Sequence, residues 1–191
     1  MLTEEETIKI LKKTNSLLEG HFILSSGLRS EKYLQCAQLM MYPDLAEKVC
    51  KSLAEKISCS KIDIDLVASP ALGGLLVGYQ VSKYLKVPNI FVERVNNKFT
   101  LRRGFECKNK KILVVEDVIT TGKSSKECAK CLEELGAQIV GYACVVDRSN
   151  GGSKINKIIS QINFNIPVFS ENDLPKHLKN IKAVKPGSRK N

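Results

Sequence analysis

The sequence lacks the features of a membrane or secreted protein. No apolar run approaches the roughly 18 residues that a membrane-spanning helix needs. The first residues, MLTEEETIKI, are acidic, whereas a secretory signal is basic and then apolar. Only two histidines are present, His21 and His177, and they stand far apart, so we expect no metal site made by the protein alone. These absences predict a cytoplasmic protein with no part in a membrane.

The cysteines are too scattered for a disulfide framework. There are seven, an odd number, whereas a secreted disulfide-rich domain is dense in cysteine and usually has an even count. Cys128 and Cys131 have the spacing of a redox or metal pair, but no second CxxC or histidine pair accompanies them. We therefore expect reduced thiols, several of them buried as small hydrophobic groups.

Acidic residues are absent from the end of the chain. None follows Asp173, whereas six lysines and arginines do, and these supply more than half of the net charge of +10. A basic tail can bind nucleic acid, but no zinc finger, RNP motif or series of stacking aromatics accompanies this one. We interpret it as a solvated end, or as a general attraction for small polyanions, and expect no nucleic-acid partner.

What is present is the composition of a globular protein. Hydrophobic residues make up 43% of the 191 residues and charged residues 26%, enough to bury one sizeable core. The length is typical of one domain, so we expect residues 1–191 to form a single domain.

Helices and strands are expected to alternate along the chain. The patterns predict helices over 3–18, 43–57, 73–85 and 122–135, and strands over 64–69, 88–95, 111–117, 139–146 and 166–170. Residues 21–36 are expected to be extended and rich in turns. Alternation of this kind, with nearly unbroken Val, Ile and Leu strands, indicates an α/β fold with a mainly parallel central sheet flanked by helices. Ligands bind such sheets beyond the carboxyl ends of their strands, which here are the loops 69–74, 94–104, 116–125 and 147–153.

The segment KILVVEDVITTGKSS, residues 111–125, carries the most chemistry. A buried strand delivers Glu116 and Asp117 to its carboxyl end, and Thr, Gly and Ser residues follow where a helix begins. Unpaired amides and the helix dipole make that position a nest for phosphate. A P-loop is excluded, because Asp117 stands where its first glycine must be. The two carboxylates instead suit ribose hydroxyls, with a 5-phosphate one turn further on.

This string resembles the PRPP-binding motif of type I phosphoribosyltransferases. The resemblance implies that the chain binds 5-phosphoribosyl 1-diphosphate (PRPP), with the two acids at the ribose hydroxyls and the loop at the 5-phosphate. The implied PRPP-binding residues in this segment are Glu116, Asp117, Val118, Ile119, Thr120, Thr121, Gly122, Lys123 and Ser124. The motif has Asp at the first acidic position, and Glu116 keeps its charge.

Other segments resemble orotate phosphoribosyltransferases. HFILSSGLRSEKYLQ (21–35) is similar to their orotate-recognition segment, ASPALGG (68–74) to their pyrophosphate loop, and AVKPGSR (183–189) to the end of a shorter branch. The resemblance implies orotate contacts from Ser25, Ser26, Thr120 and Arg148. It also implies the type I phosphoribosyltransferase fold, with a small hood from about 1–36 and 165–191, and a homodimer.

The segment VERVNNKFTLRRGF, residues 92–105, resembles the mobile catalytic loop of that family. The implied catalytic residues are Lys98 and Arg94 on the pyrophosphate and Asp117 on the ribose, with Mg2+ held by PRPP. The chain departs from the better-known branch, which has histidine at position 100 and lysine at positions 73 and 25, where this chain has Thr, Gly and Ser. Arg102 or Arg103 would then supply the missing positive charge.

The implied reaction joins orotate to PRPP, giving orotidine 5'-monophosphate and pyrophosphate in pyrimidine (UMP) biosynthesis. Two other functions stay open from the sequence. One is a purine or other nucleobase phosphoribosyltransferase, since the PRPP motif does not choose the base. The other is a PRPP-sensing regulator that binds nucleic acid through its basic surface.

Overall fold

A six-stranded sheet forms the centre of the protein. The computed structural model describes residues 1–24, 26–153 and 155–186. The strands are ordered β5-β4-β3-β6-β7-β8. All neighbours run parallel except the β4–β5 hairpin. The strand bounds are β3 (Leu66–Pro70), β4 (Asn89–Val95), β5 (Lys98–Leu101), β6 (Lys111–Ile119), β7 (Gln138–Asp147) and β8 (Ile158–Asn163).

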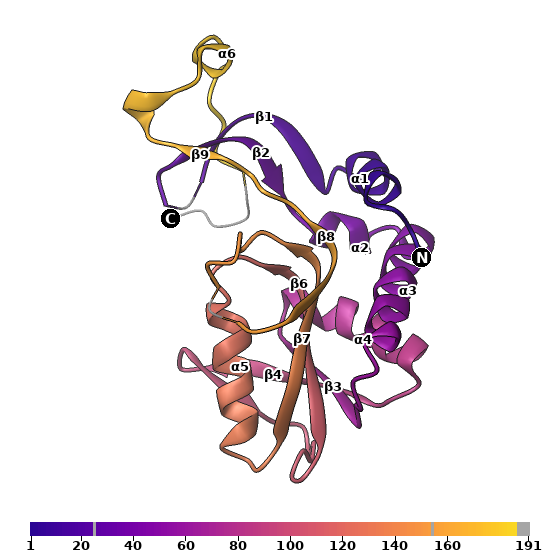
Figure 1. The fold of residues 1–191 in the computed structure, drawn as a ribbon. Helices are drawn as coiled ribbons and strands as arrows, with labels where there is room; N and C mark the ends of the chain where they lie inside the picture. Colours follow the sequence, from indigo (N-terminus) through magenta and orange to yellow (C-terminus); the bar gives the residue numbers. More distant parts are fainter. Residues whose placement is uncertain (25, 154, 187–191) are drawn as a thin grey trace.

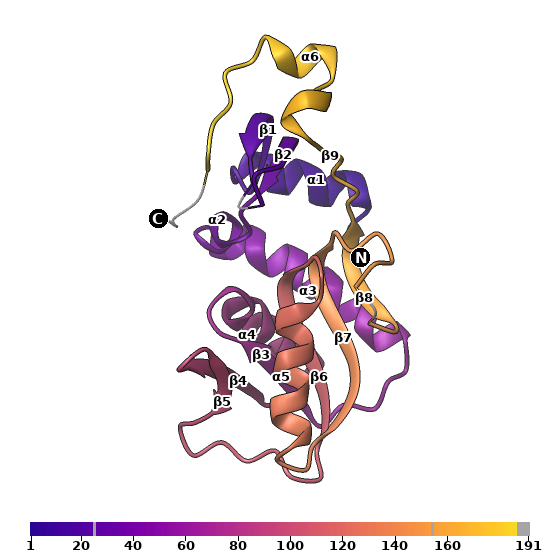
Figure 2. The same cartoon turned by 90° about the vertical axis from the view of Figure 1, so that its left-hand side faces the viewer.

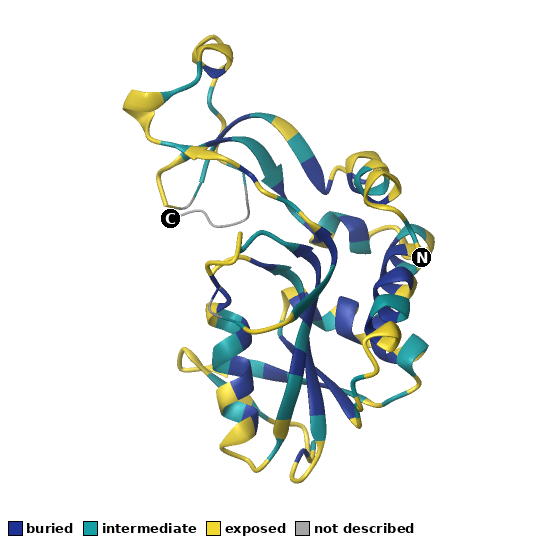
Figure 3. Cartoon of the chain, viewed as in Figure 1, coloured by how far each residue is buried: buried dark blue, intermediate teal, exposed yellow. Residues whose placement is uncertain are grey.

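Helices cover both faces of this sheet, which confirms the predicted fold class (Figure 1). On one face, Leu113 and Val115 pack with the buried side of α3 (Pro43–Cys59) and with α4 (Gly73–Leu85). On the other face, Ile112 and Val114 pack with α5 (Lys123–Glu133). Alternate residues of a strand point to opposite faces, so β6 needs an apolar residue at each of the positions 112–115, which the helices cover on both sides. Figure 3 shows the resulting buried centre.

A second, three-stranded sheet forms the hood over one end of the central sheet (Figures 1 and 2). Its order is β1-β2-β9, from β1 (Leu17–Ile23), β2 (Arg29–Leu34) and β9 (Val168–Phe169). The chain after α6 (Lys176–Lys179) then runs along β1. There the Val184 N–H donates to the His21 carbonyl at 2.9 Å, and the Ile23 N–H donates to the Val184 carbonyl at 2.8 Å. Sequence segments from both ends of the chain therefore form the hood together.

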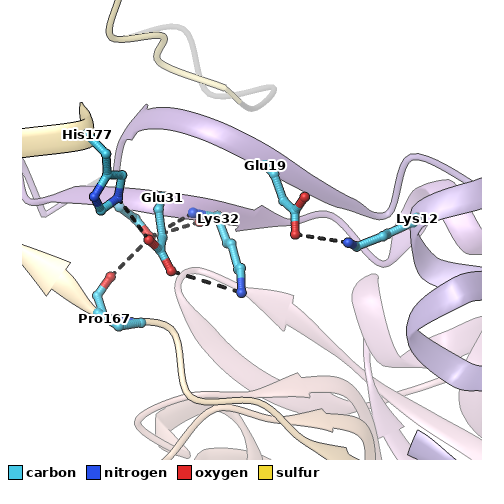
Figure 4. Close-up of polar contacts among 7 residues, drawn as sticks. Lys12, Glu19, Glu31, Lys32, Pro167 and His177 are labelled. Atoms are coloured by element: carbon cyan, nitrogen blue, oxygen red, sulfur yellow. Dashed lines mark hydrogen bonds and ion pairs between the residues drawn. The ribbon is translucent and has the colours of Figure 1, made fainter. Parts of the chain in front are cut away.

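Polar contacts fix α6 and the start of the chain to this hood (Figure 4). His177 Nε2 lies 3.2 Å from Glu31 Oε2, and Arg29 pairs with Glu171 in the short helix Glu171–Asp173. Lys12 Nζ lies 3.0 Å from Glu19 Oε1. These pairs are exposed to different degrees, and surface pairs typically contribute only about 0–1 kcal/mol each.

The first helix is shorter than the sequence predicts. The capping box of Thr3 and Glu6 is present, but α1 spans Glu4–Lys13 rather than 3–18. The Thr14 hydroxyl bonds back to the Ile10 carbonyl, and Asn15 takes a left-handed φ of 55°, which ends the helix. Leu17 and the residues after it belong to β1, so assigning them to the helix was wrong.

The remaining predicted elements occur with shifted ends, and five were missed. The missed elements are α2 (Ala37–Met40), β5, β8, the short helix Glu171–Asp173 and α6. Strand β8 is at the sheet edge, and its sequence IISQIN alternates too weakly to stand out. All seven cysteines are free, as expected. None of the helices in the described part of the chain has the length and hydropathy of a membrane span.

Candidate active site

The carboxyl end of β6 sends its two acids to opposite sides of the sheet. Glu116 is 8% exposed, and its Oε1 accepts a hydrogen bond from Ser125 Oγ at 2.9 Å, on the α5 side. Asp117 lies on the α4 side, where Oδ1 accepts from the Val118 N–H at 2.9 Å. The carboxylates thus bracket the strand end, because neighbouring strand residues alternate.

Glycines let the start of α4 approach Asp117 closely. A Cβ on Gly73 would lie 2.9 Å from Asp117 Oδ1, and a Cβ on Gly74 would lie 2.7 Å from the Val115 carbonyl. A side chain at position 73 would therefore displace the carboxylate. The close approach of α4 to Asp117 occurs at the position where the resemblance would place lysine.

The loop after β6 encloses a small cavity at the start of α5. Its volume is about 100 Å3. Gly122 has a left-handed φ of 70°, and the Lys126 N–H donates to its carbonyl at 3.0 Å as α5 begins. The lining residues are Glu116, Val118, Ile119, Thr120, Thr121, Gly122, Lys123, Ser124 and Ser125. Every predicted PRPP residue of this segment except Asp117 therefore lines one cavity.

Burial changes the acidity of the two carboxyl groups. Removal from water raises the pKa of Glu116 to about 7, against the hydrogen bond from Ser125, which lowers it. Burial also raises the pKa of Asp117, opposed by the backbone N–H groups that bond to it. Buried acids with raised pKa values are frequent where a protein binds or transforms a ligand.

The Glu116→Gln variant should be more stable than the parent protein above pH 7. The folded protein keeps the Glu116 proton up to about pH 7, whereas the unfolded chain releases it near its ordinary value of about 4.5. Between these values the folded state binds more protons, so the free energy of unfolding falls as pH rises. Glutamine carries no charge and still accepts from Ser125.

Urea unfolding at pH 5 and pH 8 measures this effect. We expect the variant to gain on the order of 1–3 kcal/mol over the parent at pH 8, and much less at pH 5. The exposed Glu106 offers a control, because Glu106→Gln should change stability little at either pH. An equal gain in the free energy of unfolding at pH 5 and pH 8 would contradict burial of the Glu116 charge as its cause.

The segment expected to be a mobile loop forms the β4–β5 hairpin, which turns at Asn96 and Asn97. Arg94 is held there: Nη2 donates to Glu127 Oε2 at 2.6 Å, Nη1 donates to the Asn97 carbonyl at 2.8 Å, and the guanidinium lies 4.1 Å from the centre of the Phe99 ring.

Lys98 lies apart from the phosphate-loop cavity. It lines a separate hollow of about 320 Å3 between the hairpin and α5, together with Asn97, Phe99, Glu127, Lys130, Cys131 and Glu134. Arg103, named above as a replacement cation, donates instead to Glu93 at 2.8 and 3.0 Å. The structure thus does not bring Lys98 into the lining of the cavity.

Arg148 follows β7 and lies between the central sheet and the hood. Its backbone N–H donates to the Ile119 carbonyl at 2.8 Å. Burial lowers the pKa of its guanidinium, whereas the nearby Cys36 and Tyr33 side chains raise that pKa. Its Nε is buried without a hydrogen-bond partner among the described residues. A buried donor of this kind suits a planar carboxylate.

The other residues predicted to contact orotate are less defined. Thr120 lines the phosphate-loop cavity, and Ser26 Oγ accepts from the Leu28 N–H at 3.4 Å on the surface. Ser25 lies outside the described residues. Sequence reasoning missed Tyr33 and Cys36 beside Arg148, and Ser125 under Glu116. Ser125 had a signal, since it is in the first turn of the helix that follows the acids, and Tyr33 lies in the segment 21–35, whereas nothing in the sequence singled out Cys36.

A family model and similar proteins of known sequence both relate this chain to phosphoribosyltransferases. The model of the phosphoribosyl transferase domain matches residues 41–173. An orotate phosphoribosyltransferase of Brucella anthropi is 43% identical over 190 residues, which are 98% of this chain and 99% of that protein. The orotate phosphoribosyltransferase of Parvibaculum lavamentivorans is 45% identical over 191 residues, 98% of each chain.

Solved structures agree in fold. The crystal structure of orotate phosphoribosyltransferase from Aeropyrum pernix has a TM-score of 0.72 to this chain, with 24% sequence identity, and the match covers 82% of this chain and 92% of that one. At this identity the likeness concerns the fold alone.

Proposed function

The chain belongs to the orotate phosphoribosyltransferase family, and on that premise we propose that it transfers the phosphoribosyl group of PRPP to orotate. The products are orotidine 5'-monophosphate and pyrophosphate, in pyrimidine (UMP) biosynthesis in the cytoplasm. The observation that carries the proposal is the cavity that Glu116 shares with the helix-start loop 118–125, in a chain that is similar to orotate phosphoribosyltransferases over nearly its whole length.

The loop and the acids would hold the sugar. Amides at the start of α5 and the hydroxyls of Thr120 and Thr121 suit the 5-phosphate, since a helix N-terminus favours an anion. Glu116 and Asp117 accept hydrogen bonds from the ribose hydroxyls, one from each side of the strand end. Their negative charge also favours the cationic sugar that forms in the transition state.

Reaction occurs at C1 of the ribose. The ring nitrogen of orotate forms a bond to C1, and the bond from C1 to the pyrophosphate oxygen breaks, with its electron pair leaving on pyrophosphate. Arg148 would orient orotate by pairing its guanidinium with the carboxylate, which uses its buried donor. Holding both reactants in line lowers the barrier through proximity alone.

Positive charge is needed at the leaving group. Lys98 and Arg94 supply it in this proposal, from the β4–β5 hairpin. The carboxylates of Glu116 and Asp117 are hard oxygen donors of the kind that Mg2+ accepts, so the site fits a metal that arrives on PRPP. When bound, Mg2+ neutralises part of the diphosphate charge.

Loss of orotate absorbance in the presence of Mg2+ and PRPP tests the proposal directly. The same mixture with adenine, hypoxanthine or uracil is the comparison, because none of these bases carries a carboxylate for Arg148. Turnover of orotate, with no turnover of the other three bases, supports the proposal. Preference for another base would make the chain a different nucleobase phosphoribosyltransferase. Binding of PRPP without turnover of any base would favour the PRPP-sensing regulator that binds nucleic acid.

We also propose that two copies of the chain associate through α4. Leu72, Leu76 and Tyr79 follow helical spacing at the start of α4 and are 84%, 51% and 63% exposed. Large apolar side chains gathered on one exposed face mark an interaction surface. This stripe begins at the loop beside Asp117, so a partner on it would sit next to the active site.

Charges placed on this stripe should separate the copies. We expect sedimentation at micromolar concentration to give a dimer for the parent protein and a monomer for Leu76→Glu with Tyr79→Glu, because burying unpaired charges of the same sign costs several kcal/mol. Leu135→Arg, at an exposed leucine beyond α5, is the control and should stay dimeric. A double variant that remains a dimer would move the interface elsewhere.

A further inference from the structure

Between β7 and β8, the loop of described residues 148–153 and 155–157 reaches from Arg148, the proposed orotate contact, to Gly122 at the start of α5. At its start the Arg148 N–H donates to the Ile119 carbonyl at 2.8 Å, and the Ser149 N–H donates to Asp147 Oδ1 at 2.8 Å. The Gly152 N–H donates back to the Ser149 carbonyl at 2.7 Å, which closes a turn. The loop is thereby attached to both β6 and β7 before it crosses the start of α5 (Figure 1).

The far end of this loop packs on Gly122. A Cβ built on Gly122 would lie 2.5 Å from Ile155 Cδ1 and 3.3 Å from Ser153 Cβ. Ser153 is buried, and its Oγ accepts from the Ile155 N–H at 3.3 Å. The Ile155 side chain therefore fills the space above the glycine Cα, where any other residue at position 122 would collide with it.

We propose that Ile155 is a positioning residue for the 5-phosphate of PRPP, an inference that rests on the proposed function. Gly122 is the residue of the loop with the greatest backbone freedom, and its left-handed φ of 70° directs the N–H groups of the helix start. Ile155 restricts that freedom before the substrate arrives, so less entropy is lost on binding. It contacts the glycine and not the substrate.

Loss of this packing should weaken PRPP binding and leave the chemical step intact. We expect Ile155→Ala to raise the KM for PRPP by about 5- to 20-fold while kcat changes by less than about twofold. Ile155→Val keeps the branched side chain and should recover most of the affinity. Calorimetric titration with PRPP in the absence of orotate should show the same ratio in Kd.

A matched control separates this role from general packing. Ile139 in β7 is also partly buried, but it packs against the cluster formed by Ile112, Val114 and α5, towards the amino end of the strand. Ile139→Ala should lower thermal stability with PRPP affinity unchanged. If Ile155→Ala fails to fold, the valine variant still tests the proposal, with an expected rise in Kd of about twofold.

Unchanged KM and Kd for PRPP in a folded Ile155→Ala protein would overturn the proposal, as would an equal loss of affinity in Ile139→Ala. Failure of the parent protein to consume orotate is a different outcome, which contradicts the proposed function. The PRPP titrations of the two alanine variants would then still decide the role of Ile155.

Discussion

Replacing Lys98 by alanine should lower kcat by about 100- to 1,000-fold while PRPP binds almost as before. Loss of one preorganised donor to a developing negative charge typically costs this much in rate. The charge on pyrophosphate grows as its bond to C1 breaks, so a lysine that meets it then acts mainly in the transition state. Steady-state kinetics with orotate and a separate PRPP titration measure the two effects.

Lys98 lies outside the phosphate-loop cavity, so a role in catalysis requires a change in its position or a second copy of the chain. Lys98 is exposed in β5 and lines the hollow beside α5 rather than the phosphate-loop cavity. Catalysis by Lys98 thus requires the hairpin to move, or to serve the neighbouring copy in a dimer. Lys110→Ala, at an exposed lysine before β6, is the matched control. Unchanged kcat in Lys98→Ala would remove this lysine from the mechanism.

Exchange of Asp117 for asparagine should weaken PRPP binding by about 10- to 100-fold. Hydrogen bonds to a charged group contribute about 1.5–3 kcal/mol, and asparagine keeps the shape while losing the charge. The Val118 N–H can still bond to its side-chain oxygen, so the strand end should stay in place. Titration of the folded variant with Mg2+ and PRPP measures the loss.

The effect should also depend on pH. Burial raises the pKa of Asp117, so its charged, hydrogen-bond-accepting form gains population as pH rises. PRPP affinity of the parent protein should therefore increase as the pH is raised through the titration of Asp117, and that of Asp117→Asn should increase less. Asp63→Asn is the control, since Asp63 pairs with Lys111 at the opposite end of β6. Equal affinity in parent and Asp117→Asn would argue against a ribose clamp.

Residues close in sequence were the ones that sequence reasoning placed well. The strand of β6, its two acids and the glycine-containing turn lie within fifteen residues, so their local order already implies that they meet at the strand end. The same reasoning found the capping box of α1. It misplaced the end of that helix, because Leu17 repeats with helical spacing but is buried as part of β1.

Contacts between distant segments could not be predicted. Arg94 meets Glu127 across 33 residues, and nothing in either segment indicates the other. Gly122 and Ile155 likewise come together only because β7 returns the chain to the start of α5. The predicted strand 111–117 already contained Glu116 and Asp117, so strand alternation implied that they point to opposite faces, whereas its continuation to Ile119 was not predicted.

The pairing of β1 with the last described residues has a consequence for synthesis of the protein. His21 Nδ1 lies 2.9 Å from the carbonyl of Ile181, 160 positions later, so the hood cannot be completed until Ile181 has left the ribosome. Chains grow from the amino end at about 5–20 residues per second. The nascent β1–β2 hairpin therefore waits for its third strand while the central sheet assembles, and a premature stop before Val168 would release a chain with an open hairpin edge.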